Sequence, residues 1–258
     1  MNILMLGDVV SAPGVNFITA NLPRIRRQYS VDFCVVNAEN SAGNGITLNI
    51  ARKLVNAGAD VLTMGNHTFR RIADFSEVVS NNIPIIRPAN YPPGTMGFGH
   101  IIVECGNISI AVINLVGRLF LEPIDCPYRS ADSAIKDISN RAQIILVDFH
   151  AEATGEKVAM GWHLDGRVSA VVGTHTHVQT ADERIFPNGT GYISDLGMVG
   201  ATDSVLGVDK EIALDRIIRR VAEKNQPGIG PVEMCGVLLD IDANTGKCLD
   251  IKRVRECD

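Results

Sequence analysis

The feature that most constrains this chain is the alternation of strand-like and helix-like segments in its first third. Helical segments are predicted near 15–28, from Thr47 as N-cap to Gly58 as the residue after the last turn, and near 71–80. Before, between and after them lie short apolar runs typical of buried strands, namely NILMLG, DFCVVNA, DVLTMG and IPIIR. This βαβα order favours a largely parallel sheet covered by helices.

The remaining two thirds predict antiparallel pairs as well. HIIVEC and ISIAVINLV flank the turn residues Gly106-Asn107, and VEMCGVLLDID and KCLDIKRV flank residues 243–246, so two hairpins are expected. Between the hairpins we expect a helix capped by Ser130 and ending near Arg141, the strand QIILVDF, a helix over EKVAMGWHLD and the strand RVSAVVG. Two mixed sheets packed face to face with helices outside are therefore predicted. No linker or repeat interrupts residues 1–258, which are expected to form a single domain.

Charge and cysteine content exclude several classes of protein. The net charge of −5 argues against a broad nucleic-acid-binding surface, although it leaves room for a local basic site. The N-terminus does not resemble a signal peptide, and no apolar run approaches the roughly 20 residues of a membrane span. The six cysteines lack C-x-x-C spacing and are expected to be reduced thiols. These features predict a cytoplasmic protein with no membrane partner.

Polar residues whose nitrogen or oxygen atoms can bind a metal ion follow five of the predicted strands. In an open α/β sheet, the carboxyl ends of parallel strands share one edge, where ligands bind. His175 and His177 lie two residues apart, so in a strand they would point to the same side. Asp8 and Asn66, taken alone, are also compatible with simple turn or N-cap roles. The side chains that could meet at this edge are Asp8, Glu39, Asn40, Asn66, His67, His150, His175 and His177.

These donors are too numerous for one catalytic zinc ion, which keeps about three protein ligands. They suit two divalent ions, with Glu39 as the natural bridging carboxylate. All of the donors are nitrogen or oxygen atoms, which suits iron, manganese or zinc. The sequence therefore predicts a binuclear centre, and these donors do not choose among the three metals.

The same residues resemble the motifs of the calcineurin-like metallophosphoesterases. GD, NAEN, GNHT, a histidine after a strand, and GTHTH follow the order D-x-H, GD-x-x-D, GNH, H and GH-x-H of that family. Val10 replaces the histidine of the first motif, and Glu39-Asn40 replaces the aspartate of the second. Both departures are similar to the YmdB-type phosphodiesterases, as are RPANYPPG, DCPYR, residues 148–185 and DLGMVG.

The resemblance implies a four-layer α/β/β/α sandwich and a role for each site residue. One ion would be held by Asp8, Glu39, Asn40 and His177, and the other by Glu39, Asn66, His150 and His175. His67 would be the general acid rather than a ligand. The implied activity is hydrolysis of phosphodiesters, with 2′,3′-cyclic nucleotides among the substrates, by a hydroxide that bridges the two ions. The resemblance also implies a homo-oligomer, so a dimer or tetramer is expected.

Other interpretations remain open from the sequence. A phosphomonoesterase or nucleotidase would use a similar centre, and a regulatory scaffold that binds RNA or nucleotides could keep the metals without turnover. Short RNA is a further possible partner. Asp148 is placed to orient His150, or is a plain buried polar group. Arg118 and Arg87–Asn90 could line a phosphate pocket, and loop structure explains them equally well.

Overall fold

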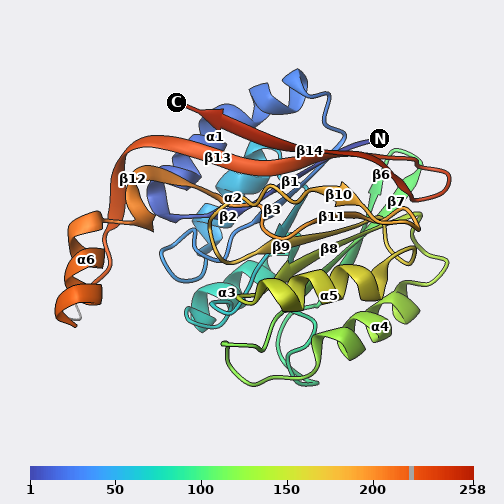
Figure 1. The fold of residues 1–258 in the computed structure, drawn as a ribbon, viewed down its shortest axis with the longest axis horizontal. Helices are drawn as coiled ribbons and strands as arrows, with labels where there is room; N and C mark the ends of the chain where they lie inside the picture. The colour runs from blue at the N-terminus through green and yellow to red at the C-terminus, as the bar shows by residue number, and fades with distance from the viewer. Residues whose placement is uncertain (221–223) are drawn as a thin grey trace.

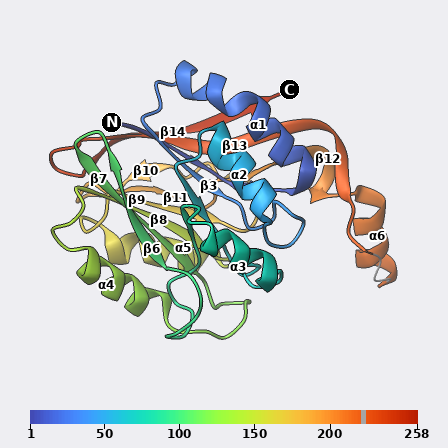
Figure 2. The ribbon, with the colours of Figure 1, turned by 180° about the vertical axis from the view of Figure 1, so that it is seen from behind.

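The computed structural model describes residues 1–220 and 224–258, which form two mixed β-sheets stacked face to face with helices on both outer faces. Figures 1 and 2 show α1, α2 and α3 on one side of the stack, and α4 and α5 on the other. The predicted four-layer α/β/β/α sandwich is confirmed.

The first sheet carries the N-terminal strands. Its order is β2-β12-β13-β1-β3-β4-β5, and β14 pairs with β13. β1, β3, β4 and β5 run parallel, whereas β13 is antiparallel to β1, β12 and β14. The bounds are β1 Asn2–Leu6, β2 Asp8–Val9, β3 Phe33–Asn37, β4 Val61–Thr63, β5 Ile85–Ile86, β12 Met198–Val208, β13 Pro227–Ile241 and β14 Cys248–Cys257.

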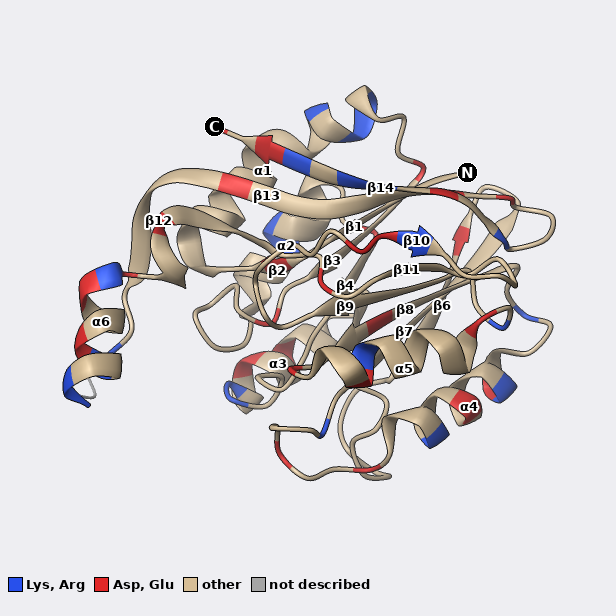
Figure 3. Cartoon of the chain, in the orientation of Figure 1, with Lys and Arg blue, Asp and Glu red and all other residues tan. Residues whose placement is uncertain are grey.

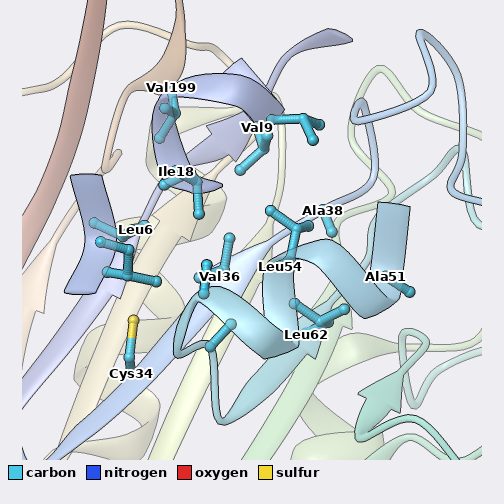
Figure 4. Close-up of a cluster of buried hydrophobic side chains, with 14 of the residues drawn as sticks. Leu6, Val9, Ile18, Cys34, Val36, Ala38, Ala51, Leu54, Leu62 and Val199 are labelled. Atoms are coloured by element: carbon cyan, nitrogen blue, oxygen red, sulfur yellow. The ribbon is translucent and has the colours of Figure 1, made fainter. Parts of the chain in front are cut away.

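Three helices cover the outer face of this sheet: α1 Ser11–Gln28, α2 Leu48–Ala57 and α3 Ile72–Ser80. The caps predicted for α2 are confirmed, because the Thr47 hydroxyl accepts from Ile50 N and Gly58 adopts φ 115°. Figure 4 shows the core beneath these helices, where Ile18, Val36 and Leu54 meet with no exposed surface. Burial of such side chains contributes roughly 1.5–3 kcal/mol each.

The second sheet has the order β10-β11-β9-β8-β7-β6. β7, β8, β9 and β11 are parallel, and the antiparallel pair β6–β7 confirms the hairpin predicted at Gly106-Asn107. α4 Pro127–Ile138 and α5 Thr154–Leu164 cover its outer face. The bounds are β6 His100–Cys105, β7 Ile108–Val116, β8 Ile144–His150, β9 Ala170–Thr174, β10 Arg184–Ile185 and β11 Gly191–Ile193.

The inner faces of the two sheets share a second core. Met5 and Val35 of the first sheet and Val112 and Leu146 of the second belong to one buried cluster. The contact fixes the positions of the two sheets, so the carboxyl ends of their parallel strands meet at one end of the molecule. The hairpin predicted at residues 243–246 is also confirmed, by the antiparallel pair β13–β14.

Two helix starts differ from the prediction. α1 begins at Ser11 rather than near residue 15. α4 begins at Pro127 after Cys126, not after Ser130, and ends at Ile138. Proline suits the first turn because the amide hydrogen it lacks would have no partner there, and this preference outweighs the serine signal.

One helix projects from the sandwich. α6 Lys210–Arg219, which follows β12 and precedes β13 in the chain, lies beside the body of the molecule (Figure 1). Asp209 caps it by accepting from Glu211 N and Ile212 N. In the described part of the chain, no helix has the length and apolar character needed to cross a membrane. All six cysteines are free thiols, as predicted.

Candidate metal centre

The two sheets deliver the predicted side chains to one place. Asp8, Glu39, Asn40, Asn66 and His67 follow strands of the first sheet, whereas His150, His175 and His177 come from β8 and the end of β9 in the second. The contacts below bring these side chains together, although two sheets rather than a single edge supply them.

Three donor atoms crowd around Nε2 of His150, which is fully buried. Its Nε2 lies 3.0 Å from Asn66 Oδ1, 2.9 Å from His175 Nδ1 and 3.1 Å from Glu39 Oε1. Ligand atoms of Glu39, His150 and His175 lie within 4.8 Å of one another. A Cβ at Gly65 would lie 2.2 Å from Glu39 Oε2, so the glycine of the GNH motif allows this close approach.

A second group of donors lies on the other side of Glu39. Asn40 Nδ2 is 3.3 Å from Glu39 Oε1 and 3.0 Å from His177 Nε2, which is in turn 3.8 Å from Asp8 Oδ1. A half-turn of the Asn40 amide would place its oxygen beside His177 and make it available as a ligand. Glu39 therefore lies between two donor groups, as a bridging carboxylate must.

His67 borders both groups without lying inside either. Its Nδ1 is 2.9 Å from Asn40 Oδ1 and 3.1 Å from Glu39 Oε1, and its backbone N donates to Glu39 Oε2 at 3.1 Å. The side chain is a quarter exposed and lines the cavity at the mouth of the site. With Nδ1 facing these acceptors, Nε2 is the ring nitrogen left for a substrate.

Each of the three other imidazoles has an outer partner that determines which nitrogen faces the centre. Thr174 Oγ1 donates to Asp148 Oδ1 at 2.7 Å, so it must accept from His150 Nδ1, 2.9 Å away. His175 Nε2 lies 3.0 Å from Glu152 Oε2, and His177 Nδ1 donates to the Leu206 carbonyl at 3.0 Å. His150 Nε2, His175 Nδ1 and His177 Nε2 are thereby directed inward, as ligands require.

The electrostatics of the site fit a cation. Burial raises the pKa of Asp8 to about 6, and Asp8 Oδ1 is buried without a hydrogen-bond partner among the described residues. Burial acts on Glu39 too, but His150 and His67 hold its pKa well below the usual range. Burial favours neutral His150, yet Glu39 and Asp8 outweigh it and raise its pKa to about 9.

Burial and the charge of His150 lower the pKa of His175 to about 3, so its Nδ1 carries a lone pair. The raised pKa of His150 favours a proton on Nε2, which faces the Glu39, Asn66 and His175 acceptors. Those acceptors and His150 itself are ligands of the kind that iron, manganese and zinc take, so a metal ion can replace this proton.

The histidine pair lies in a turn rather than a strand, which corrects one prediction. β9 ends at Thr174, and His175 and His177 both have positive φ, 105° and 65°. Such backbone is costly for residues other than glycine and needs support from outside the turn. Asp8 Oδ2 accepts from His175 N at 3.0 Å, and Asp195 Oδ2 accepts from Thr176 N at 3.1 Å. The two imidazoles consequently point to different donor groups.

Asp148 contributes through Thr174 and not by direct contact with His150. Its carboxylate accepts from Thr174, Asn37 and Thr63, and it thereby joins strands of both sheets. Glu152, Thr174 and the Leu206 carbonyl were missed by sequence reasoning. The first two lie within two residues of a predicted ligand, which was a usable signal. A backbone carbonyl gives no signal in the sequence.

The loop residues considered for the phosphate pocket have structural roles. Arg87 Nη1 donates to the Pro88 carbonyl, and Asn90 Nδ2 donates to the Val116 carbonyl. Neither residue lines the cavity at the metal centre, and neither does Arg118. That cavity has a volume of about 1280 Å³ and extends from His67, His175 and His177 to α6.

Comparisons with known proteins agree with this geometry. A family model described as YmdB-like protein matches residues 4–254. The 2′,3′-cyclic-nucleotide 2′-phosphodiesterase of Bacillus subtilis (strain 168) is 46% identical over 257 residues, which are 98% of this chain and 96% of that protein. The crystal structure of a hypothetical protein from Thermus thermophilus is 35% identical, with a TM-score of 0.93 and complete coverage of both chains.

A more distant structure extends the likeness of the fold. The calcineurin-like phosphoesterase YfkN from Bacillus subtilis superposes with a TM-score of 0.60 at 15% identity, over 99% of this chain and 90% of that one. The chain therefore belongs to the YmdB-like protein family, and its architecture is that of the calcineurin-like phosphoesterases.

Proposed function

We propose that this protein is a dinuclear metal-dependent phosphodiesterase that hydrolyses 2′,3′-cyclic nucleotides. The observation that carries the proposal is the convergence of two donor groups on Glu39, beside Asp8 Oδ1, which is buried without a hydrogen-bond partner among the described residues. The relative that is 46% identical is named a 2′,3′-cyclic-nucleotide 2′-phosphodiesterase, which supports the same substrate.

The distances favour one assignment of ligands. Asp8, Asn40 and His177 would hold one ion and Asn66, His150 and His175 the other, with Glu39 shared between them. Bound there, two ions would supply Lewis acidity toward the phosphate and lower the pKa of a water molecule. Nitrogen and oxygen donors suit iron or manganese, and zinc as a third choice.

His67 is proposed as the general acid. Glu39 Oε1 orients its ring through Nδ1, so the cationic form offers Nε2–H to the cavity. Water adds to phosphorus, the bond from phosphorus to the ribose O2′ breaks, and O2′ takes the proton from His67. The product is a nucleoside 3′-phosphate. Proton donation to a leaving oxygen typically contributes ~10²–10⁴ in rate.

A substrate comparison tests the proposal. The protein is loaded with manganese or iron, its metal content is measured, and adenosine 2′,3′-cyclic phosphate is compared with the 2′- and 3′-monophosphates on the same preparation. We expect turnover of the cyclic diester with about two ions per chain and little release of phosphate from the monoesters. Preferential hydrolysis of the monoesters would favour a phosphomonoesterase or nucleotidase. Turnover that survives complete chelation would overturn the metal mechanism, and metal binding without turnover would favour the scaffold.

Self-association and cytoplasmic location stay predictions. α6 offers exposed apolar side chains, among them Leu214 and Ile218, that a second copy of the chain could cover. Sedimentation at several protein concentrations measures whether a dimer or tetramer forms.

A further inference from the structure

The cavity at the metal centre is larger than a single cyclic nucleotide needs. Its volume of about 1280 Å³ exceeds the ~300–1,000 Å³ of ordinary small-molecule sites. His67 and His177 line it at the centre, whereas Ala213, Arg216 and Ile217 line it on α6. The cavity is therefore a groove that leads from the reacting phosphate toward the projecting helix.

The walls of this groove are basic in a chain of net charge −5. Two acidic residues occur among the described lining residues, Glu39 and Glu152, and both contact histidines of the centre. Figure 3 shows basic residues next to the start of α3 and on α6. The basic lining residues are Lys53, Arg70, Arg71, Arg216 and Lys224.

Part of this charge is balanced by neighbours that do not line the groove. Arg70 pairs with Glu122 at 3.0 Å and Arg71 with Asp74 at 2.8 Å. Lys53 and Lys224 are exposed. Positive charge on the walls of the groove suits a substrate that carries negative groups in addition to the reacting phosphate.

The groove also carries an apolar face. Val15, Ile50, Leu206 and Ile217 line it between the basic residues. Leu206 and Ile217 are exposed apolar side chains, 46% and 65% accessible. Proteins that bind single-stranded nucleic acid combine a positively charged groove with side chains, typically aromatic, on which the bases pack. Among the described lining residues of this groove, aliphatic side chains take that place.

Building on the proposed function, we propose that the preferred substrate is the 3′ end of an RNA strand that carries a 2′,3′-cyclic phosphate. Such a phosphate uses both the 2′ and the 3′ oxygen, so the strand continues only through the 5′ oxygen of the terminal ribose. A single groove leading away from the metal centre accommodates that geometry. Water adds to phosphorus, the bond to O2′ breaks and O2′ is protonated, which leaves an RNA 3′-phosphate.

The test compares two substrates with the same reacting group. kcat/KM is measured on the manganese-loaded protein for adenosine 2′,3′-cyclic phosphate and for a six-nucleotide RNA ending in adenosine 2′,3′-cyclic phosphate. We expect the RNA to be favoured by about tenfold or more at low salt, with the advantage falling as salt rises.

Charge variants locate the effect. The double substitution Lys53→Gln with Lys224→Gln should lower the ratio of the two kcat/KM values by about tenfold and make its salt dependence shallower by about 1.4 logarithmic units per decade of salt. The matched control, Lys136→Gln with Lys252→Gln, removes two exposed charges on α4 and β14, away from the groove, and should leave both substrates unchanged.

The outcomes separate this inference from the proposed function. Turnover of the mononucleotide with no preference for the RNA, or a preference that the groove variants do not reduce, overturns the RNA-end proposal and leaves the phosphodiesterase standing. The RNA-end proposal is overturned in the same way if sedimentation shows that a second copy of the chain fills the groove. No turnover of either substrate by the loaded protein overturns both.

Discussion

The candidate metal centre and the projecting helix α6 (Lys210–Arg219), called the α6 arm below, lie at opposite ends of one groove and are built differently. At the centre, Asp8, Glu39 and His150 have no exposed surface, and partners from both sheets hold them. On the arm, Ile217 and Ile218 are 65% and 72% exposed. The positions of the buried side chains at the centre therefore depend on packing throughout the sandwich. The arm instead exposes its side chains to solvent, which suits it to contact a substrate.

The two regions nevertheless touch at one hydrogen bond. Leu206, in the last part of β12 before α6, has φ 55° and accepts the Nδ1 proton of His177 through its carbonyl. β12 also changes register against β13 between Asp203 and Val208. The base of the arm thus helps to orient one predicted metal ligand.

The largest effect is expected from a ligand of the buried centre. Asp8→Ala should remove the carboxylate near His177 and the acceptor of His175 N, so metal content and kcat/KM fall together, the latter by about 10³ or more. Metal analysis and turnover on one preparation measure this. The matched variant Asp137→Ala, exposed on α4, should change neither. Full metal content in Asp8→Ala would refute its assignment as a ligand.

His67→Ala should separate chemistry from metal binding. We expect metal content to be retained and kcat to fall by about 10²–10⁴ for adenosine 2′,3′-cyclic phosphate, because the leaving oxygen loses its proton donor. The loss should be smaller for bis-para-nitrophenyl phosphate, whose leaving group needs no proton. If the substitution instead stripped the metals, or slowed both substrates equally, His67 would not be the acid.

Thr174→Val probes the outer support of the centre. The substitution removes the acceptor of His150 Nδ1 and leaves the shape of the side chain nearly unchanged. We expect metal affinity to weaken by about 10–100-fold, as measured by competition with a chelating dye. Thr19→Val, exposed on α1, is the matched control. Unchanged affinity in Thr174→Val would mean that packing alone orients His150.

A pH series tests whether a metal replaces a proton. Because the pKa of His150 is raised to about 9, its ring is protonated at neutral pH in the metal-free protein, and that proton must leave when a metal binds. Apparent affinity should therefore rise with pH by about tenfold per unit until it levels near pH 9. Calorimetry in buffers of different ionisation enthalpy should detect about one proton released from this site. Affinity independent of pH between 6 and 8 would contradict this.

The donors were predictable from the sequence because parallel strands end at a shared edge and each carries a distinctive side chain there. For Asp8, Glu39 and Asn66 of the first sheet that rule was enough, whereas bringing His150 beside them also required the second sheet to stack on the first. The strained turn at His175 and His177 was not predictable, since its support comes from Asp8 and Asp195, far along the chain. The start of α4 was wrong because proline at the first turn outweighed Ser130. The Leu206 carbonyl could not be found because its role depends on backbone direction and not on residue type.

The smallest effect is expected from a substitution on the arm. An isoleucine of the arm is therefore compared with a buried isoleucine of the sandwich. Ile18→Ala in α1 empties a fully buried position and should cost about 2–5 kcal/mol in the free energy of unfolding. Ile218→Ala in α6, which is 72% exposed, should change it by less than about 0.5 kcal/mol. Urea denaturation at two protein concentrations measures both. If Ile218→Ala destabilised the protein by more than about 1 kcal/mol, and only at the higher concentration, the arm would be a subunit contact. The apolar side chains of the arm would then be buried between two subunits. The arm would in that case be a buried region like the sandwich and not an exposed one.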